Sequence, residues 1–342
     1  MMISPEKQVT DKRGRPMRDL RISVTDRCNF RCVYCMPKEL FGSDHAFLER
    51  KRLLSFEEIT RVARAFVAQG VVKLRITGGE PLVRRELEKL IASLAGIEGV
   101  QEISLTTNGS LLTLDKAKSL KDAGLTRLTV SLDAIDEQIF AAINDVKFPV
   151  SRVLDGIENA NKAGLAPVKV NMVVARGMNE NEILPMARHF RNTGVVLRFI
   201  EFMDVGNTNG WELDKVVSAQ EIVDTISAEF PLIAMDANYR GEVAKRWRYK
   251  DGAGEVGIIS SVTQPFCGTC NRSRLSAEGV FYTCLFANRG HDLRELLRSG
   301  ADDEQLLEFV TNVWRKRDDH YSEIRSGQTH GIPKIEMSYI GG

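Results

Sequence analysis

The six cysteines of the chain fall into two triplets, and neither triplet contains a fourth thiol or a histidine. Thiolates at such short spacing suit a soft metal or an iron-sulfur cluster. A structural zinc site normally has four protein ligands, so a metal centre held by three thiolates keeps one position open to a small molecule. The triplets are Cys28, Cys32 and Cys35, spaced CxxxCxxC, and Cys267, Cys270 and Cys284, spaced CxxC with thirteen further residues before the last thiol.

Other uses of these cysteines remain open at this point. Zinc completed by a distant residue is an alternative for the second triplet, and His291 is the nearest histidine in sequence. Six cysteines in 342 residues are far fewer than a disulfide-dense secreted domain has, which disfavours disulfides. The first triplet differs in its first gap from the CxxCxxC run of ferredoxins, so an ordinary electron carrier is disfavoured too.

The overall charge gives no reason to expect a nucleic acid or a membrane as partner. Lys and Arg total 47 and Asp and Glu total 46, which leaves a formal net charge of +1. Residues 1–20 are polar and charged without the apolar stretch of a secretion signal, and no apolar run approaches the length of a membrane span. We therefore expect a soluble, cytoplasmic protein whose thiols stay reduced or bind metal.

The elements that must position these thiols alternate along the chain. Between about residues 21 and 202, short strand-like segments take turns with segments of helical period, which is typical of βα units around a parallel sheet. Ser55 and Glu58 form a capping box before one such helix. The six predicted strands are 21–25, 72–77, 102–107, 127–132, 168–174 and 197–202.

The pattern changes after about residue 235. A hairpin-like pair covers 243–250 and 255–260, and helical segments follow at 291–298 and 303–317. We therefore predict an α/β fold: an incomplete (β/α)6 TIM-like barrel over residues 1–235, with the first triplet, and a C-terminal α+β extension over 236–342, with the second.

One face of every predicted strand is polar, and most of its charges are basic. A complete barrel fills its interior with apolar side chains, so a polar interior indicates a wider, incomplete barrel with a hydrophilic occupant. The excess of basic groups favours a polyanionic small molecule. A half-solvated antiparallel sheet with one wet face is the alternative. The basic residues are Arg21, Lys73, Arg75, Arg127, Lys169 and Arg198, and the acidic ones are Glu102 and Asp133.

The sequence around the first triplet, CNFRCVYC with Tyr34 before the last thiol, resembles the signature of radical S-adenosylmethionine enzymes. Across nearly the whole chain, further motifs resemble the family within that superfamily that cyclises GTP in molybdenum cofactor biosynthesis. These motifs are GGEP at 78–81, TTNG at 106–109, VSLD at 130–133, CGTCNRSR at 267–274, Cys284, and the terminal Gly341 and Gly342.

The resemblance implies that the first triplet holds a 4Fe-4S cluster whose open iron binds S-adenosylmethionine. In this family a 5'-deoxyadenosyl radical then abstracts the C3' hydrogen of GTP, and the ribosyl radical attacks C8 of guanine. The product is (8S)-3',8-cyclo-7,8-dihydroguanosine 5'-triphosphate. The residues that the resemblance places around S-adenosylmethionine are Tyr34, Gly79, Ser131 and Met203.

The resemblance further implies a second 4Fe-4S cluster at Cys267, Cys270 and Cys284, with an open iron that anchors the guanine base. Arg272 and Arg274 are implied in catalysis, together with a Gly341–Gly342 tail that enters the active site, where only residues without side chains fit. The implied GTP contacts are Arg21, Arg75, Thr106, Lys169, Arg272 and Arg274.

The partners implied by the resemblance are the substrate GTP, an electron donor, a second copy of the chain in a homodimer, and a cyclic pyranopterin monophosphate synthase that acts on the product. The basic and aromatic stretch KRWRYK at 245–250 is better explained as an exposed strand than as a nucleic acid site. The five histidines show no paired spacing, so we predict no histidine-ligated metal. A peptide-modifying radical enzyme and a zinc-stabilised binding protein are the rival functions.

Overall fold

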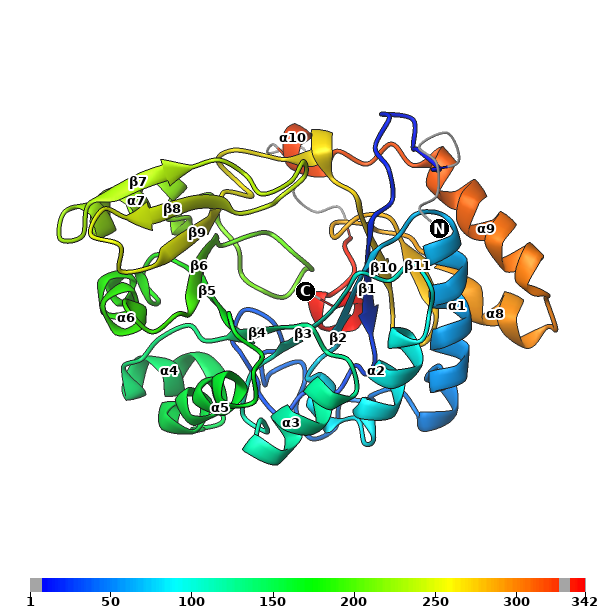
Figure 1. The fold of residues 1–342 in the computed structure, drawn as a ribbon, viewed down its shortest axis with the longest axis horizontal. Helices are drawn as coiled ribbons and strands as arrows, with labels where there is room; N and C mark the ends of the chain where they lie inside the picture. Colours follow the sequence, from blue (N-terminus) through cyan, green and yellow to red (C-terminus); the bar gives the residue numbers. More distant parts are fainter. Residues whose placement is uncertain (1–7, 326–332, 342) are drawn as a thin grey trace.

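The computed structural model describes residues 8–325 and 333–341, and one twelve-stranded sheet forms its centre (Figure 1). The strand order is β12-β11-β10-β1-β2-β3-β4-β5-β6-β9-β8-β7, so the sheet has two free edges and does not close. Strands β1 to β6 run parallel to one another. The strands are β1 Asp19–Ser23, β2 Lys73–Thr77, β3 Glu102–Thr107, β4 Arg127–Ser131, β5 Lys169–Val174, β6 Val196–Glu201, β7 Leu232–Met235, β8 Lys245–Tyr249, β9 Glu255–Ile259, β10 Arg272–Leu275, β11 Val280–Tyr282 and β12 His291–Asp292.

Helices connect the parallel strands and lie on the outer side of the curved sheet (Figure 1). The capping box is present at the start of α1, where Ser55 Oγ accepts from the Glu58 amide at 3.1 Å. Within the described ranges, no helix is both long and apolar enough to cross a bilayer. The helices are α1 Phe56–Ala68, α2 Leu87–Ala95, α3 Leu114–Asp122, α4 Glu137–Asn144, α5 Val150–Lys162, α6 Ile183–Phe190, α7 Ala219–Ser227, α8 Leu293–Arg298, α9 Asp303–Lys316, α10 Tyr321–Ile324 and α11 Met337–Ile340.

The predicted incomplete barrel is confirmed. Each of the six predicted strands is present within two residues of its expected bounds, and their parallel pairing rules out the antiparallel alternative. The apolar members of each strand, such as Ile22 and Ile76, are 0% exposed and belong to the main hydrophobic core with the helices. Polar residues such as Arg21 and Arg75, paired in register on β1 and β2, alternate with them and therefore lie on the opposite, inner face.

The residues after 235 extend this same sheet at both edges. The predicted hairpin forms between β8 and β9, and β9 then runs parallel to β6. At the other edge β10 runs parallel to β1 and starts the antiparallel ribbon of β10, β11 and β12. The helix predicted over 291–298 begins at Leu293, because the first two residues form β12, whereas α9 matches the segment 303–317 closely. The domain boundary at 235 stays a prediction.

Candidate active site

The first cysteine triplet lies in the loop that follows β1, at the carboxyl ends of the parallel strands. The three thiols are free, and the amides of Cys35 and Met36 both donate to the carbonyl of Cys32 at 2.9 Å. Burial raises the pKa of Cys28 to about 11, and it also raises the pKa of Cys32 and Cys35, which neighbouring thiols raise further. Three buried thiolates need a cationic centre to offset their charge, so this donor set fits a cluster.

The GGEP turn after β2 packs its backbone against the cysteine loop. The amide of Gly79 donates to Thr25 O at 2.8 Å, and the amide of Glu80 donates to Arg27 O at 2.8 Å. A Cβ atom on Gly79 would lie 2.3 Å from the Arg27 carbonyl oxygen. Only glycine permits this approach, and Gly79 therefore fixes the loop immediately before Cys28.

The Glu80 carboxylate links three of the motifs. It is 1% exposed and accepts from Thr107 Oγ1 at 2.7 Å and from the amide of Asn108 at 2.7 Å, both in the TTNG segment at the end of β3. Asn108 Nδ2 in turn donates to Asn29 Oδ1 at 2.9 Å and lies 3.9 Å from Cys28 Sγ. Burial raises the pKa of Glu80 to about 7, against the hydrogen bonds that lower it.

Tyr34 fixes the far end of the cysteine loop. Its hydroxyl donates to Asp133 Oδ2 at 2.6 Å, and Asp133 Oδ1 accepts from the amide of Val173 at 2.9 Å. Burial raises the pKa of Asp133 to about 6. Asp133, which the alternation predicts on the polar face, follows the end of β4 and is 5% exposed.

The four residues expected around S-adenosylmethionine come from separate parts of the chain, and all four lie at the carboxyl ends of the parallel strands. Tyr34 is in the loop after β1, Gly79 follows β2, Ser131 ends β4 and Met203 follows β6. The ring of Tyr34 lies 6.5 Å from that of Phe202, beside Met203. Carboxyl ends of parallel strands are where barrel enzymes bind their ligands.

The polar face lies between the two triplets, and most of its charged side chains are cations. Glu102 pairs with Arg127 at 3.2 Å and lies 3.8 Å from Lys73. The other four basic residues of this face make no ion pair with a described residue. The Nε atoms of three of them are buried without a hydrogen-bond partner in the described part of the chain, and the four are Arg21, Arg75, Lys169 and Arg198.

These cations also repel one another. Burial lowers the pKa of Lys169 to about 7, and Arg198, Arg127 and Arg75 lower it further. Burial and the charge of Arg75 lower the pKa of Arg198 to about 9. The pKa of Arg21 is lowered by burial and then by Arg274 and Arg75. Buried, mutually repelling and unpaired donors are stabilised by a bound polyanion, as the sequence predicts.

Thr106 belongs to the same face, where its hydroxyl accepts from Arg75 Nη1 at 3.5 Å.

The second triplet lies at the opposite, amino end of this face. Cys267 and Cys270 precede β10, and Cys284 follows β11. Arg272 Nη2 donates to Cys270 Sγ at 3.2 Å, and the amide of Phe286 donates to Cys284 Sγ at 3.4 Å. The free thiols therefore already accept hydrogen bonds of the kind that stabilise thiolates.

The thiols of Cys270 and Cys284 have different electrostatic surroundings. Burial raises the pKa of Cys284 to about 12. Burial also acts on Cys270, but the charges of Arg272 and Arg317 outweigh it and lower the pKa of that thiol to about 6. Across residues 8–325 and 333–341, no three Cys, His, Asp or Glu side chains are grouped as the ligands of a single metal ion would be. The ring of His291 lies 6.3 Å from Phe281.

The C-terminal tail reaches this polar face beside β1 and β2 (Figure 1). Arg274 Nη1 donates to the carbonyl of Gly341 at 2.9 Å, and Arg274 is 3% exposed. Gly341 has a φ of 74°, and a Cβ atom there would lie 2.3 Å from Thr77 Cγ2. Glycine is therefore required at Gly341 by both conformation and space. The expected role of Gly342 concerns a residue outside the described ones.

Comparison with known proteins agrees with this arrangement. The Radical SAM superfamily matches residues 22–190, and the family Molybdenum Cofactor Synthesis C matches residues 195–323. GTP 3',8-cyclase of Staphylococcus carnosus is 52% identical over 98% of this chain and 99% of that protein. GTP 3',8-cyclase of Acidothermus cellulolyticus is 50% identical over the same shares. This chain belongs to the GTP 3',8-cyclase family.

Solved structures show the same fold at low sequence identity. Streptococcus suis SuiB bound to precursor peptide SuiA is 14% identical, with a TM-score of 0.63 over 92% of this chain and 68% of that one. SuiB bound to S-adenosylmethionine is 15% identical, with a TM-score of 0.59 over 86% of this chain and 68% of that one. As a radical S-adenosylmethionine enzyme, this GTP 3',8-cyclase family member uses that cofactor with a 4Fe-4S cluster.

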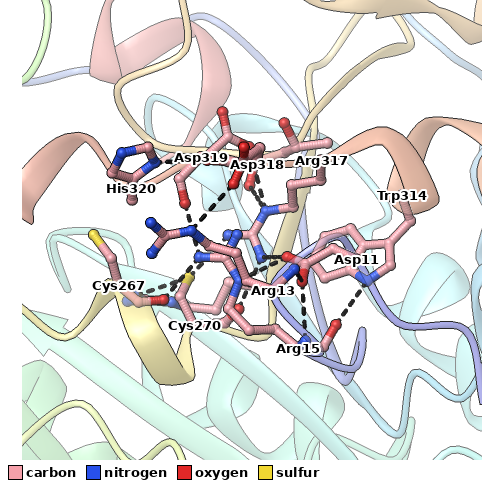
Figure 2. Close-up of polar contacts among 12 residues, drawn as sticks. Asp11, Arg13, Arg15, Cys267, Cys270, Trp314, Arg317, Asp318, Asp319 and His320 are labelled. Atoms are coloured by element: carbon pink, nitrogen blue, oxygen red, sulfur yellow. Dashed lines mark hydrogen bonds and ion pairs between the residues drawn. The ribbon is translucent and has the colours of Figure 1, made fainter.

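The charged residues that lie around Cys267 and Cys270 in Figure 2 were not predicted from the sequence. Asp11, Arg15 and Arg317 are buried around Cys267 and Cys270, although they lie at the two ends of the chain. No motif marks them, because each is an ordinary charged residue in a polar stretch. Arg317 follows the last residue of the amphipathic helix α9, and basic residues are common at that position, so the sequence gives no signal of what it contacts.

Proposed function

We propose that this chain converts GTP to (8S)-3',8-cyclo-7,8-dihydroguanosine 5'-triphosphate with S-adenosylmethionine and two 4Fe-4S clusters. The observation that carries the proposal is the placement of two incomplete thiol triplets at opposite ends of one buried, cationic face. Three thiolates per site leave an iron open at each end, which suits two different small-molecule ligands. The membership of the chain in the GTP 3',8-cyclase family supports the identity of both ligands.

The triphosphate of GTP binds the cations of the polar face. Arg21, Arg75 and Arg198 each offer a buried Nε donor without a partner among the described residues, and phosphate oxygens are acceptors for such forks. Lys169 adds a point charge and Thr106 a hydroxyl. Arg272, beside Cys270, directs the nucleotide toward the second triplet, where Cys267, Cys270 and Cys284 would hold a cluster that anchors the guanine base.

The reaction needs the two ligands held at a fixed separation and kept from water. When bound, S-adenosylmethionine and the first cluster supply the 5'-deoxyadenosyl radical that takes the C3' hydrogen of GTP. Glu80 and Tyr34 hold the loop of the first triplet, while Gly79 keeps its backbone close. Arg274 holds the carbonyl of Gly341 against Thr77, so the tail closes one side of the site without side-chain bulk.

The test is anaerobic reconstitution followed by assay with GTP, S-adenosylmethionine and dithionite. We expect about eight irons per chain, from two four-iron clusters, together with release of 5'-deoxyadenosine and the cyclised nucleotide. Product from a peptide substrate in place of GTP contradicts the choice of substrate. A colourless protein that contains zinc and releases no deoxyadenosine overturns the proposal and favours a zinc-stabilised binding protein.

We also propose a location, an oligomeric state and partners for the enzyme. It acts in the cytoplasm as a homodimer, an electron donor reduces the first cluster, and a cyclic pyranopterin monophosphate synthase uses the product. The first 235 residues form the catalytic barrel and the rest the domain of the second cluster. Light scattering of the reconstituted protein tests the dimer, and a mass of one chain contradicts it.

A further inference from the structure

A buried ion network lies behind the second triplet (Figure 2). Asp11 Oδ2 accepts from Arg15 Nε at 2.6 Å and from Arg317 Nη1 at 2.9 Å. The three side chains are between 0% and 2% exposed. Trp314 closes the network, because its indole Nε1 donates to Arg15 O at 3.1 Å and its ring lies 4.5 Å from the Arg317 guanidinium carbon. Buried charges of this kind persist only where each is paired.

The guanidinium of Arg317 contacts both Cys270 and the residue before Cys284. Arg317 Nη2 donates to Cys270 Sγ at 3.4 Å and Nη1 donates to Cys270 O at 2.9 Å. Arg317 Nε donates to the carbonyl of Thr283, the residue before Cys284, at 3.0 Å. The planar guanidinium of Arg317 thus holds the chain at Cys270 and next to Cys284, which are fourteen positions apart in the sequence. Neither a lysine nor a neutral amide offers donors in this arrangement.

Arg15 extends the same arrangement to the third cysteine. Its Nη1 donates to Cys267 O at 2.8 Å and to Asp319 O at 2.7 Å. Its Nη2 is buried and has no hydrogen-bond partner among the described residues. Through its Nη1 and Nε donors, Arg15 ties the backbone of Cys267 to the same ion network that holds Arg317.

We propose that Arg317, held by Asp11, is a positioning residue that sets the reduction potential of a cluster bound at Cys267, Cys270 and Cys284. This inference rests on the proposed function, which supplies the second cluster. A cationic N–H donor on a ligating sulfur stabilises the more negative, reduced cluster, and hydrogen bonds to cluster sulfurs are known to set its potential. Without Arg317 the second cluster becomes harder to reduce, while the first cluster does not change.

The experiment uses the full chain with Cys28, Cys32 and Cys35 replaced by alanine, so that iron binds at the second triplet alone. In this background Arg317→Gln, Arg317→Lys and Asp11→Asn are compared after anaerobic reconstitution. The readouts are iron and sulfide content, and the midpoint potential from a titration followed by electron paramagnetic resonance. Arg188→Gln is the matched control, because that arginine pairs with Glu229 on the surface at 2.6 Å.

We expect Arg317→Gln to shift the midpoint potential to more negative values, Arg317→Lys to shift it less in the same direction, Asp11→Asn, which removes a buried negative charge near the cluster, to shift it to less negative values, and Arg188→Gln to leave it unchanged. Full iron content with the parental potential in Arg317→Gln overturns the inference. If Arg317→Gln loses its iron, the midpoint potential of Arg317→Lys tests the inference instead. A potential of Arg317→Lys equal to that of the parent overturns the inference as well.

Failure of the proposed function gives a different result. A parent protein that binds zinc or no iron at the second triplet overturns the second cluster itself, and the inference falls with it. Normal thermal unfolding of each variant, followed by circular dichroism, shows that the potential does not change through loss of the fold.

Discussion

The two cysteine triplets have the same ligand number but opposite surroundings. The side chains nearest the thiols of the first triplet are neutral or acidic, with Asn108 beside Cys28 and the Asp133 carboxylate acting on Cys32, and the cation Arg31 donates to the backbone carbonyl of Cys28. The second is surrounded by guanidinium groups, with Arg272 and Arg317 on the same sulfur of Cys270. The contrast appears at Cys270, because arginines bring the pKa of that thiol to about 6 despite burial, whereas burial raises the pKa of Cys28 to about 11 and that of Cys284 to about 12.

This difference matches the charge of the ligand at each end. S-adenosylmethionine is a sulfonium cation, and an environment with acidic neighbours such as Asp133 accommodates a positive ligand. GTP carries a triphosphate, and the cationic face that begins at Arg272 and continues through Arg21 accommodates a negative one. The chain therefore uses one sheet to present two thiol triplets with different electrostatic surroundings.

The sharpest test of this difference is to remove one thiol at each site. We expect Cys28→Ala to abolish release of 5'-deoxyadenosine, because the first cluster is lost. We expect Cys270→Ala to abolish the cyclised nucleotide while some S-adenosylmethionine cleavage continues. Chromatography of both products distinguishes these outcomes. Cyclised product from Cys270→Ala contradicts the assignment of the second site.

The C-terminal tail contacts Thr77, at the end of β2, and Arg274, on β10, through Gly341. The variant Gly341→Ala tests whether these contacts are needed. A methyl group there would meet Thr77, so the tail must move, and we expect cyclisation to fall by about 100-fold with both clusters retained. Gly164→Ala is the control, because it has a similar φ of 78° with nothing within 4 Å of the added atom. Equal losses in the two variants would assign the effect to backbone strain alone.

Much of the fold could be predicted because it follows from local patterns. Alternation identified the strands, and the Ser55 capping box identified the start of α1. The prediction for Asp133 extended the alternation of β4 beyond the last residue of that strand, Ser131. Arg317 and Asp11 could not be found, since 306 positions separate these paired residues and only the packed structure brings them together.

The charge of the cationic face is tested by measuring GTP binding as a function of pH. Burial, with Arg198, Arg127 and Arg75, lowers the pKa of Lys169 to about 7 in the free protein. A bound triphosphate favours the charged form, so affinity should fall as pH rises through 7. Loss of one contact to a charged group, about 1.5 kcal/mol, corresponds to roughly tenfold weaker GTP binding between pH 6 and pH 8.

Calorimetry measures this affinity, and Lys169→Arg provides the control because it stays charged throughout this range. We expect Lys169→Arg to remove most of the pH dependence of GTP binding. If the variant keeps the same dependence as the parent, another group or the nucleotide itself titrates, and Lys169 does not.

The neutral half of the comparison is tested by Glu80→Gln, which has the smallest expected effect. The variant replaces an oxygen that accepts from the Asn108 amide with an NH2 group, and we expect a loss of about 1–3 kcal/mol in the free energy of unfolding.

The pH dependence of that loss follows from the pKa of Glu80, which burial raises to about 7 in the folded protein. Between its unfolded pKa, roughly 4.3, and the folded value, the folded chain binds more protons, so the contribution of Glu80 to stability decreases as pH rises. The deficit of Glu80→Gln should therefore be larger at pH 5 than at pH 8 in urea unfolding. Glu86→Gln, on an exposed residue that pairs with Lys89, should show no deficit at either pH, and equal deficits for Glu80→Gln would mean that its carboxyl does not titrate in this range.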